Sequence, residues 1–281
     1  MTRAVYCGDH TALATAKWGD LIYVDTRDLS LAPHIMMFGD WEPWVTNCMA
    51  DILQHNKGCT FYDVGANFGW FSLLASRLGA ARVFAFEPNP RLAELFLKSM
   101  SVNGRRDRVT LEQVAIGPGI GRARLIVTNE MGGGHIEPAH RVREVDPRER
   151  PPGRHEQALR EALGEPQVLC DVVPLNEFQP DWAGIEKRGE STVCIVKIDV
   201  EGYEPQVLAG AREILRRRPI LFIEQHRDEA HTEMIRDLQA QDYDVRHVQH
   251  TGHTSKSLSL DEAAEVVDAE TFLCVPKGTN P

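Results

Sequence analysis

The sequence has 281 residues, of which 42% are hydrophobic and 26% are charged, with a formal net charge of −10 at pH 7. These proportions are typical of globular proteins and exclude general disorder. The negative charge argues against sequence-independent binding to nucleic acid and against an anionic membrane surface, because both depend on cationic side chains. We therefore expect neither as a partner.

The length is close to the size at which a single core still suffices, so we expect one domain with additions. No window approaches the ~20 apolar residues that cross a bilayer, and no signal-peptide pattern is seen. The six cysteines include no Cys-x-x-Cys pair and are typical of buried thiols in a reducing compartment. These features predict a cytoplasmic protein.

Residues 1–57 are predicted to form an extension that packs on the core. A Gly-Asp step between two alternating runs predicts a β-hairpin with strands at 14–17 and 21–25. Helical spacing of apolar residues predicts a helix over 45–53. Trp41, just before this helix, either covers a ligand cleft and contacts substrate or anchors the extension.

Residues 58–281 are predicted to form the main domain, because short apolar runs alternate with amphipathic helices, as in βαβ units around a parallel sheet. The expected strands are 61–64, 82–87, 109–115, 122–128, 168–173, 193–199, 219–224, 243–248 and 271–275. The expected helices are 70–78, 90–100, 203–217 and 229–239. Prolines, arginines and acids crowd residues 137–166, which we interpret as an insertion: a solvated loop or a lid over substrate. The predicted fold class is a doubly wound α/β domain.

The first strand ends in Asp63 and leads into a loop with Gly65, Asn67 and Gly69 ahead of a helix. Glycine allows a ligand to approach the backbone closely, and a helix start offers unpaired N–H groups. The loop lacks the third glycine of the dinucleotide turn and the Gly-Lys-Ser/Thr of a triphosphate loop. We therefore expect S-adenosylmethionine as cofactor, with NAD as the alternative.

Ligands of open α/β sheets bind at the carboxyl ends of the strands, so residues there are candidate cofactor contacts. Asp63 is expected to hold the methionine ammonium and Asn67 the methionine carboxylate. Glu87, at the end of the second strand, is positioned to accept both ribose hydroxyls. Gln113 and Ala115, after the third strand, are expected beside the adenine edge.

Methyl transfer to an alcohol requires the hydroxyl to lose a proton, and the sequence offers two solutions. His226 is a candidate general base, because its ordinary pKa lies near neutrality. Alternatively, Asp199 and Glu224 are candidate ligands of Mg²⁺, which would lower the pKa of the hydroxyl. Lys197 is expected to pair with Asp199 or another carboxylate.

Two further residues are candidate substrate contacts. Glu201 belongs to the same group of acids and either contacts substrate or stabilises a helix N-terminus. His135 follows three consecutive glycines in a loop, and loops are where substrate contacts concentrate.

Several motifs together resemble the FkbM-type S-adenosylmethionine-dependent methyltransferases. They are Phe-Tyr-Asp-Val-Gly-Ala-Asn-Phe-Gly at 61–69, Phe-Glu-Pro at 86–88, Lys-Ile-Asp-Val-Glu-Gly-Tyr-Glu at 197–204 and Val-Leu-Ala-Gly-Ala at 207–211. The resemblance covers about residues 14–225, and the insertion at 137–166 departs from it. It implies a class I methyltransferase fold with a mostly parallel seven-stranded sheet, and places Asp199 beside the cofactor as well.

The resemblance also implies O-methylation of a hydroxyl on a small natural product, sugar or glycan. The partner is then a small hydroxyl acceptor, and a homo-oligomer is possible. A NAD-dependent oxidoreductase and a non-catalytic S-adenosylmethionine-binding scaffold are the alternatives, because function cannot be taken from fold alone.

Overall fold

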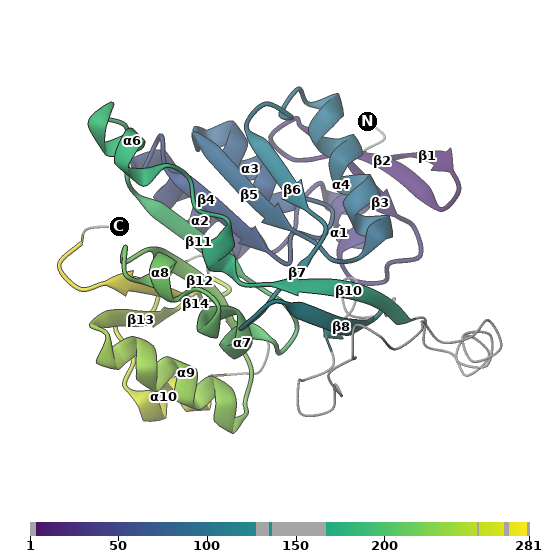
Figure 1. Ribbon diagram of the computed structural model, residues 1–281. Helices are drawn as coiled ribbons and strands as arrows, with labels where there is room; N and C mark the ends of the chain where they lie inside the picture. Colours follow the sequence, from purple (N-terminus) through teal and green to yellow (C-terminus); the bar gives the residue numbers. More distant parts are fainter. Residues whose placement is uncertain (1–3, 128–134, 137–166, 252, 267–269, 280–281) are drawn as a thin grey trace.

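The computed structural model describes residues 4–127, 135–136, 167–251, 253–266 and 270–279. Within these residues the strands form three sheets, the largest with seven strands in the order β13-β14-β12-β11-β4-β5-β6 (Figure 1). Its members are β4 (Thr60–Val64), β5 (Arg82–Phe86), β6 (Val109–Glu112), β11 (Cys194–Ile198), β12 (Ile220–Gln225), β13 (Tyr243–His247) and β14 (Glu270–Pro276).

The large sheet is mostly parallel. The strands from β12 through β11, β4 and β5 to β6 run parallel, and β14 is antiparallel to both β12 and β13. The helices between and beside the strands are α3 (Trp70–Leu78), α4 (Pro90–Val102), α6 (Trp182–Lys187), α7 (Glu204–Ala209), α8 (Arg212–Leu215), α9 (Glu229–Ala240) and α10 (Leu260–Glu265), with a 3₁₀ turn η1 (Leu175–Glu177). The predicted α/β class and seven-stranded sheet are confirmed.

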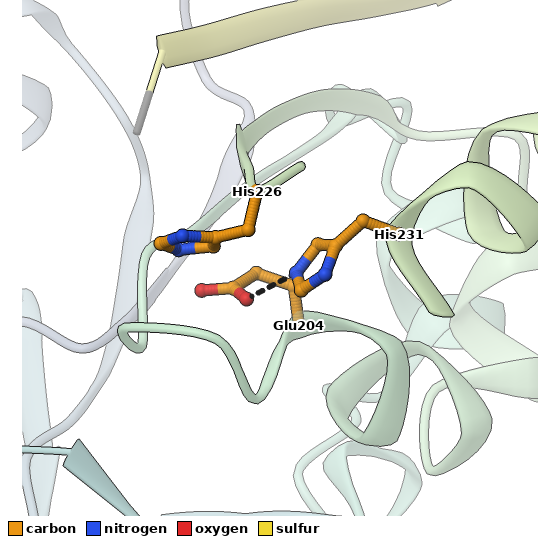
Figure 2. Close-up of side chains that lie close together, drawn as sticks. All are labelled: Glu204, His226 and His231. Carbon is orange, nitrogen blue, oxygen red and sulfur yellow. Dashed lines mark hydrogen bonds and ion pairs between the residues drawn. The ribbon is translucent and has the colours of Figure 1, made fainter. Parts of the chain in front are cut away.

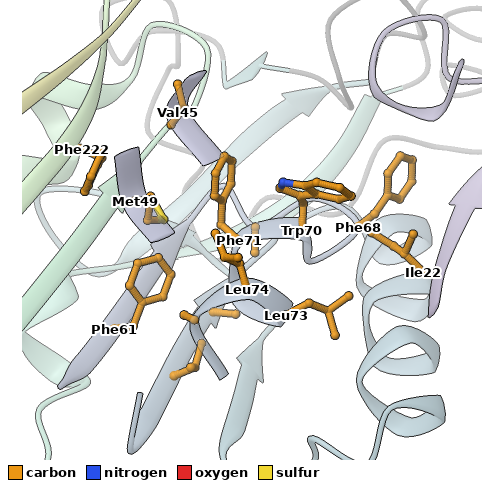
Figure 3. Close-up of a cluster of buried hydrophobic side chains, with 14 of the residues drawn as sticks. Ile22, Val45, Met49, Phe61, Phe68, Trp70, Phe71, Leu73, Leu74 and Phe222 are labelled. Carbon is orange, nitrogen blue, oxygen red and sulfur yellow. The ribbon is translucent and has the colours of Figure 1, made fainter. Parts of the chain in front are cut away.

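Successive strand residues point to opposite faces of the sheet, so the sheet separates two apolar cores. Phe61 packs on one face with α3, α4 and the N-terminal helix α2 (Pro43–His55), whereas Tyr62 packs on the other face with α7 and α9. Figure 3 shows the first core, in which Phe71 and Phe222 are buried near Met49 of the N-terminal segment. The β-strands read as continuous apolar runs because both of their faces are covered.

The N-terminal segment forms a three-stranded antiparallel sheet of β1 (Ala4–Gly8), β2 (Thr11–Thr15) and β3 (Leu21–Asp25), followed by α1 (Leu31–Phe38) and α2 (Pro43–His55). The hairpin and the second helix are confirmed. The first hairpin strand begins and ends earlier than expected. It ends at Thr15 because Ala16 already belongs to the turn and donates its N–H to the carbonyl oxygen of Asp20. The sequence patterns did not predict β1 or α1, and the division of the chain at residue 57 stays a prediction.

The expected strand over 109–115 is wrong, because this stretch splits between two sheets. β6 completes the large sheet, whereas β7 (Ala115–Ile116) pairs with β10 (Gln167–Val173) in a four-stranded sheet of described residues. β8 (Gly121–Ile126) and β9 (His135–Ile136) complete that sheet. Apolar residues occur on both sides of Glu112 and Gln113, so the pattern alone does not reveal that the chain leaves one sheet for another there.

The expected continuous helix over 203–217 is also wrong, because it divides into α7 and α8 at Gly210. A Cβ on Gly210 would lie 2.0 Å from the carbonyl oxygen of Gly117, so the helix break lets the backbone pass close to the β7 turn. The proposed insertion at 137–166 lies outside the described residues. Among the described helices, we find none with the length and apolar character required to cross a bilayer.

Candidate active site

A cavity of about 340 Å³ opens at the carboxyl ends of the central parallel strands. Val64, Phe86 and Ile198 are paired in register across β5, β4 and β11, so the residues that follow them share one edge of the sheet. Gly65 and Glu87 both line the cavity there. Its volume falls in the usual range for small-molecule sites, about 300–1,000 Å³.

The Glu87 carboxylate is held rigidly at the cavity wall. Its Oε2 accepts the backbone N–H of Asn67 at 2.9 Å, and its Oε1 accepts the backbone N–H of Asn89 at 2.9 Å. The side chain is only 6% exposed, and burial raises its pKa to about 7 although both N–H groups lower it. A carboxylate has about four acceptor positions, so each oxygen keeps capacity for one ribose hydroxyl.

The loop after β4 is shaped by one close backbone approach. Gly65 has φ of 82°, and a Cβ there would lie 1.8 Å from the carbonyl oxygen of Asp199. Only glycine fits at this position, where the cofactor loop passes the loop after β11. Asn67 lines the cavity with φ of 49°, in the left-handed region that asparagine tolerates.

Gly69 has a packing role instead of a cavity role. A Cβ at this position would lie 2.7 Å from Phe96 and Met100 on α4, so glycine lets the start of α3 pack closely against that helix. The cavity wall includes Gly65 and Asn67 but does not include Gly69.

An apolar wall lies beside Glu87. It consists of Phe86, Leu92, Val114, Ala115, Ile116 and Leu125. Ala115, one of the expected adenine contacts, lies in this wall. Gln113, the other expected adenine contact, is exposed to solvent and does not line the cavity. Its neighbour Val114 lines the cavity instead.

Asp63 lies behind the cavity wall and not in it. Its Oδ2 accepts the Ser72 hydroxyl at 2.6 Å, which ties the end of β4 to α3. The side chain is 1% exposed, and burial raises its pKa although Lys197 and Ser72 lower it. Its Oδ1 has no hydrogen-bond partner among the described residues. Direct contact with a methionine ammonium therefore stays a prediction.

Lys197 is the buried cation of the site, as its side chain lies between two carboxylates. It is 4% exposed, and its Nζ contacts Asp199 Oδ2 at 2.7 Å, which confirms the expected pairing. Burial lowers the pKa of Lys197, but the charges of Asp199, Asp63 and Glu42 outweigh it and raise the pKa overall. Lys197 therefore remains protonated and fixes Asp199.

Three carboxylates gather at the end of the cavity away from the apolar wall. Asp199, Glu201 and Glu224 all line it and have oxygens within 4.8 Å of one another. Burial together with the Asp199 charge raises the pKa of Glu201 to about 8 and that of Glu224 well above its ordinary value. Burial and the neighbouring carboxylates thus favour the protonated forms of Glu201 and Glu224.

His226 lies next to this group of acids. Its Nε2 contacts Glu224 Oε2 at 3.1 Å, and Glu224 rather than His226 is part of the cavity wall. His135 lies on β9, where it pairs with Ile126 of β8. Its role as a substrate contact stays a prediction.

The N-terminal segment closes one side of the cavity. Trp41 lines it, as expected, together with Glu42, Ser30 and Leu31. Glu42 has φ of 39°, and burial and the Asp199 charge raise its pKa to about 7. Glu42 was not among the predicted site residues, because its place before the helix that begins at Pro43 does not show that its side chain reaches the cavity.

The fold and the site define a class of protein. A seven-stranded sheet with an antiparallel β14 between β12 and β13, a glycine loop after its central strand and an acid at the end of the next strand are the features of a class I methyltransferase. The model of the methyltransferase FkbM domain matches residues 63–245. The chain belongs to this family of S-adenosylmethionine-dependent methyltransferases.

Two curated relatives share parts of the sequence. The methyltransferase sdnD of Sordaria araneosa is 29% identical over 160 residues, which cover 54% of this chain and 60% of sdnD. An arginine N(omega)-methyltransferase of Streptomyces achromogenes subsp. streptozoticus is 41% identical over 54 residues, 19% of this chain and 15% of that protein. The chain thus matches less than two thirds of the length of either relative.

Among solved structures, the O-methyltransferase from Bacillus cereus in complex with SAH is similar at 10% identity and a TM-score of 0.44. The alignment covers 85% of this chain and 83% of that one.

Proposed function

We propose that this protein is an S-adenosylmethionine-dependent O-methyltransferase that acts on a hydroxyl of a small natural product, sugar or glycan. One observation carries the proposal: a single cavity joins Glu87 and the apolar wall at one end to the Asp199, Glu201 and Glu224 carboxylates at the other. The first end suits a bound nucleoside, and the second end supplies carboxylates that can accept a proton. Family membership favours S-adenosylmethionine over NAD.

The residues at the first end fit the cofactor. Each Glu87 oxygen accepts one backbone N–H and retains capacity for a ribose hydroxyl, and Ala115 belongs to an apolar wall suited to adenine. Asn67 also lines the cavity. When bound, S-adenosylmethionine supplies an electrophilic methyl group on its sulfonium.

The residues at the second end would take the proton of the acceptor. Glu224 faces the cavity, has a raised pKa and contacts His226 at 3.1 Å. A base works best when its pKa lies near the operating pH, and raised carboxyl pKa values serve this need. We propose that Glu224 accepts the hydroxyl proton and that His226, through its contact with Oε2, orients Glu224.

Alternatively, these acids could bind a divalent cation that activates the acceptor hydroxyl. Asp199, Glu201 and Glu224 offer three carboxylate oxygens, and Mg²⁺ prefers oxygen ligands. The two arrangements differ in one measurable respect, which is the response to chelation.

The same carboxylates support a second candidate acceptor. Burial and the Asp199 charge raise the pKa values of Glu42, Glu201 and Glu224, and a cationic guanidinium beside these carboxyls would stabilise their ionised forms. The Streptomyces relative is named as an arginine methyltransferase. N-methylation of a guanidinium is therefore the alternative to O-methylation.

The test is methyl transfer from radiolabelled S-adenosylmethionine to two acceptor panels, one of neutral polyhydroxylated compounds and one of guanidino compounds. Our proposal predicts label in the hydroxyl panel and its loss in Glu224→Gln, with Glu229→Gln on the exposed start of α9 as the matched control. Label confined to guanidino compounds would replace the proposal with its alternative. Absence of transfer to both panels, with cofactor binding intact, would refute both.

A further inference from the structure

The loop between β11 and α7 presents the acidic end of the cavity. Asp199, Val200 and Glu201 belong to this loop and all line the cavity. Glu201 has φ of 55°, a left-handed conformation that is strained for a residue with a long side chain. Such conformations persist only where surrounding contacts determine them. The loop therefore needs a support.

Glu204, the first residue of α7, supplies that support. Its Oε1 accepts the backbone N–H of Val200 at 2.8 Å and that of Gly202 at 3.3 Å. The side chain is completely buried. A buried carboxylate that accepts two N–H groups of one loop fixes the path of that loop, but it requires a positive partner of its own.

That partner is His231, a completely buried residue of α9. Its Nε2 lies 2.8 Å from Glu204 Oε2, and its Nδ1 lies 2.8 Å from Asp228 Oδ1. Both ring nitrogens thus face carboxylate oxygens, which are acceptors when ionised, so both nitrogens carry protons. Figure 2 shows His231 reaching Glu204, with His226 beside the pair.

The electrostatics agree with a charged ring. Burial lowers the pKa of His231, but hydrogen bonds to Glu204 and Asp228 more than compensate and raise it overall. Glu204 faces the ring from α7, Asp228 faces it from the start of α9, and His226 faces it from the loop after β12 with ring centroids 5.0 Å apart. The two carboxylates flank the ring on both sides.

We propose that His231 is a positioning residue of the acceptor site: as an imidazolium bound to Glu204, it holds the 199–203 loop so that Asp199 and Glu201 face the acceptor. This inference rests on the proposed function for its catalytic consequence. The structural link itself, from Asp228 through His231 and Glu204 to the loop amides, does not depend on which acceptor is methylated.

The direct test is hydrogen exchange of the Val200 and Gly202 amides in His231→Gln. We expect exchange at these two amides to accelerate at least about tenfold, while the amides of β11 remain as in the wild type. His55→Gln, an exposed histidine at the end of α2, is the control and should change neither. Unchanged exchange at Val200 and Gly202 in a folded His231→Gln variant would overturn the proposal.

A second variant covers the case in which His231→Gln does not fold. Asp228 has a side chain that is 54% exposed, and Asn at this position keeps an oxygen that can accept the His231 backbone N–H. Asp228→Asn should lower the pKa of the ring and accelerate exchange at Val200 and Gly202. In the wild type, NMR of the ring nitrogens at pH 7 should show both protonated; a neutral tautomer would contradict the proposal.

The catalytic consequence is measured separately. In His231→Gln we expect kcat to fall at least about tenfold, because small misplacements of catalytic groups are costly. Exchange and NMR need no methyl transfer, so an inactive wild type would refute the proposed function and leave the positioning role testable. Accelerated exchange with unchanged kcat would refute the catalytic consequence.

Discussion

The backbone N–H of Asn67 donates to the carboxylate of Glu87 at 2.9 Å, which joins the loop after β4 to the end of β5. A residue suited to hold the ribose of the cofactor therefore also shapes the loop that would hold the methionine end. Substitution of Glu87 should therefore weaken the binding of both ends of the cofactor. Glu87→Gln removes the negative charge but keeps the size of the side chain and one acceptor oxygen, so it tests the contribution of the charge alone.

Cofactor binding should strengthen as pH rises from 6 to 8. The pKa of Glu87 is raised to about 7, so the free protein holds this carboxyl largely protonated at pH 6, whereas the ribose hydroxyls bind best to the ionised form. The ionised fraction rises about tenfold across this range, so the Kd for S-adenosylhomocysteine should fall about tenfold. Calorimetry of Glu87→Gln should show a much weaker pH dependence; an equal dependence in the variant would assign it to another group.

The same shift affects the stability of the free protein. Because the folded pKa of Glu87 lies above the value of 4.5 in an unfolded chain, the folded state binds more protons between these values. The free energy of unfolding should therefore decrease from pH 5 to pH 7, by about 2 kcal/mol from this group. Urea denaturation of Glu87→Gln should show a flatter profile, and a profile as steep as that of the wild type would be the contrary result.

Gly65→Ala should destabilise the protein and abolish cofactor binding. A Cβ at this position would lie 1.8 Å from the carbonyl oxygen of Asp199, so the two loops must separate. Gly104 has φ of 64° with no atom within 4 Å of an added Cβ, so Gly104→Ala controls for backbone strain alone. We expect Gly65→Ala to cost at least about 2 kcal/mol more than the control in urea denaturation. Equal losses would show that the close approach is unimportant.

Lys197→Met should be strongly destabilising, because it leaves the buried Asp63 and the partly buried Asp199 without their shared cation. Breaking a buried pair from one side costs about 3–5 kcal/mol, which thermal denaturation readily resolves. Lys98 pairs with Glu94 at the surface, and Lys98→Met should change stability by less than about 1 kcal/mol. A similarly small effect at position 197 would mean that the carboxyls there are protonated and need no cation.

Exhaustive chelation should leave methyl transfer intact if Glu224 and His226 act as the base. The contact between these residues needs no ion to bring them together, since Nε2 and Oε2 already lie 3.1 Å apart. Turnover is measured before and after treatment with EDTA, and again after addition of MgCl₂. Loss of turnover that Mg²⁺ restores would favour the metal arrangement of Asp199 and Glu224.

Local sequence patterns were sufficient to predict the strands of the large sheet and the acids at the ends of three of them. Buried strands covered on both faces appear as continuous apolar runs, and an acid directly after such a run, as at Glu87, lies at the carboxyl edge of the sheet. The same reasoning located Asp199 and Glu224. Each of these residues depends only on its own strand.

The remaining features depend on contacts between distant segments. The stretch over 109–115 reads as one strand, yet its last residue pairs with β10 in another sheet. Glu42 and His231 come from segments far from the glycine loop in sequence, and no local pattern shows that they reach the acidic end of the cavity or its support. Asp63 also reads as a ligand from its place at a strand end, whereas Ser72 holds it behind the wall.

Titration of S-adenosylhomocysteine into the wild type and Glu87→Ala tests the central claim, that this cavity is the cofactor site. Isothermal calorimetry should show saturable binding at one site in the wild type and a loss of affinity of about a hundredfold in the variant, since hydrogen bonds to a charged group contribute about 1.5–3 kcal/mol each. Glu112→Ala, at the end of the neighbouring strand β6, should bind as the wild type does. The absence of binding in the wild type, or equal affinity in Glu87→Ala, would contradict the account.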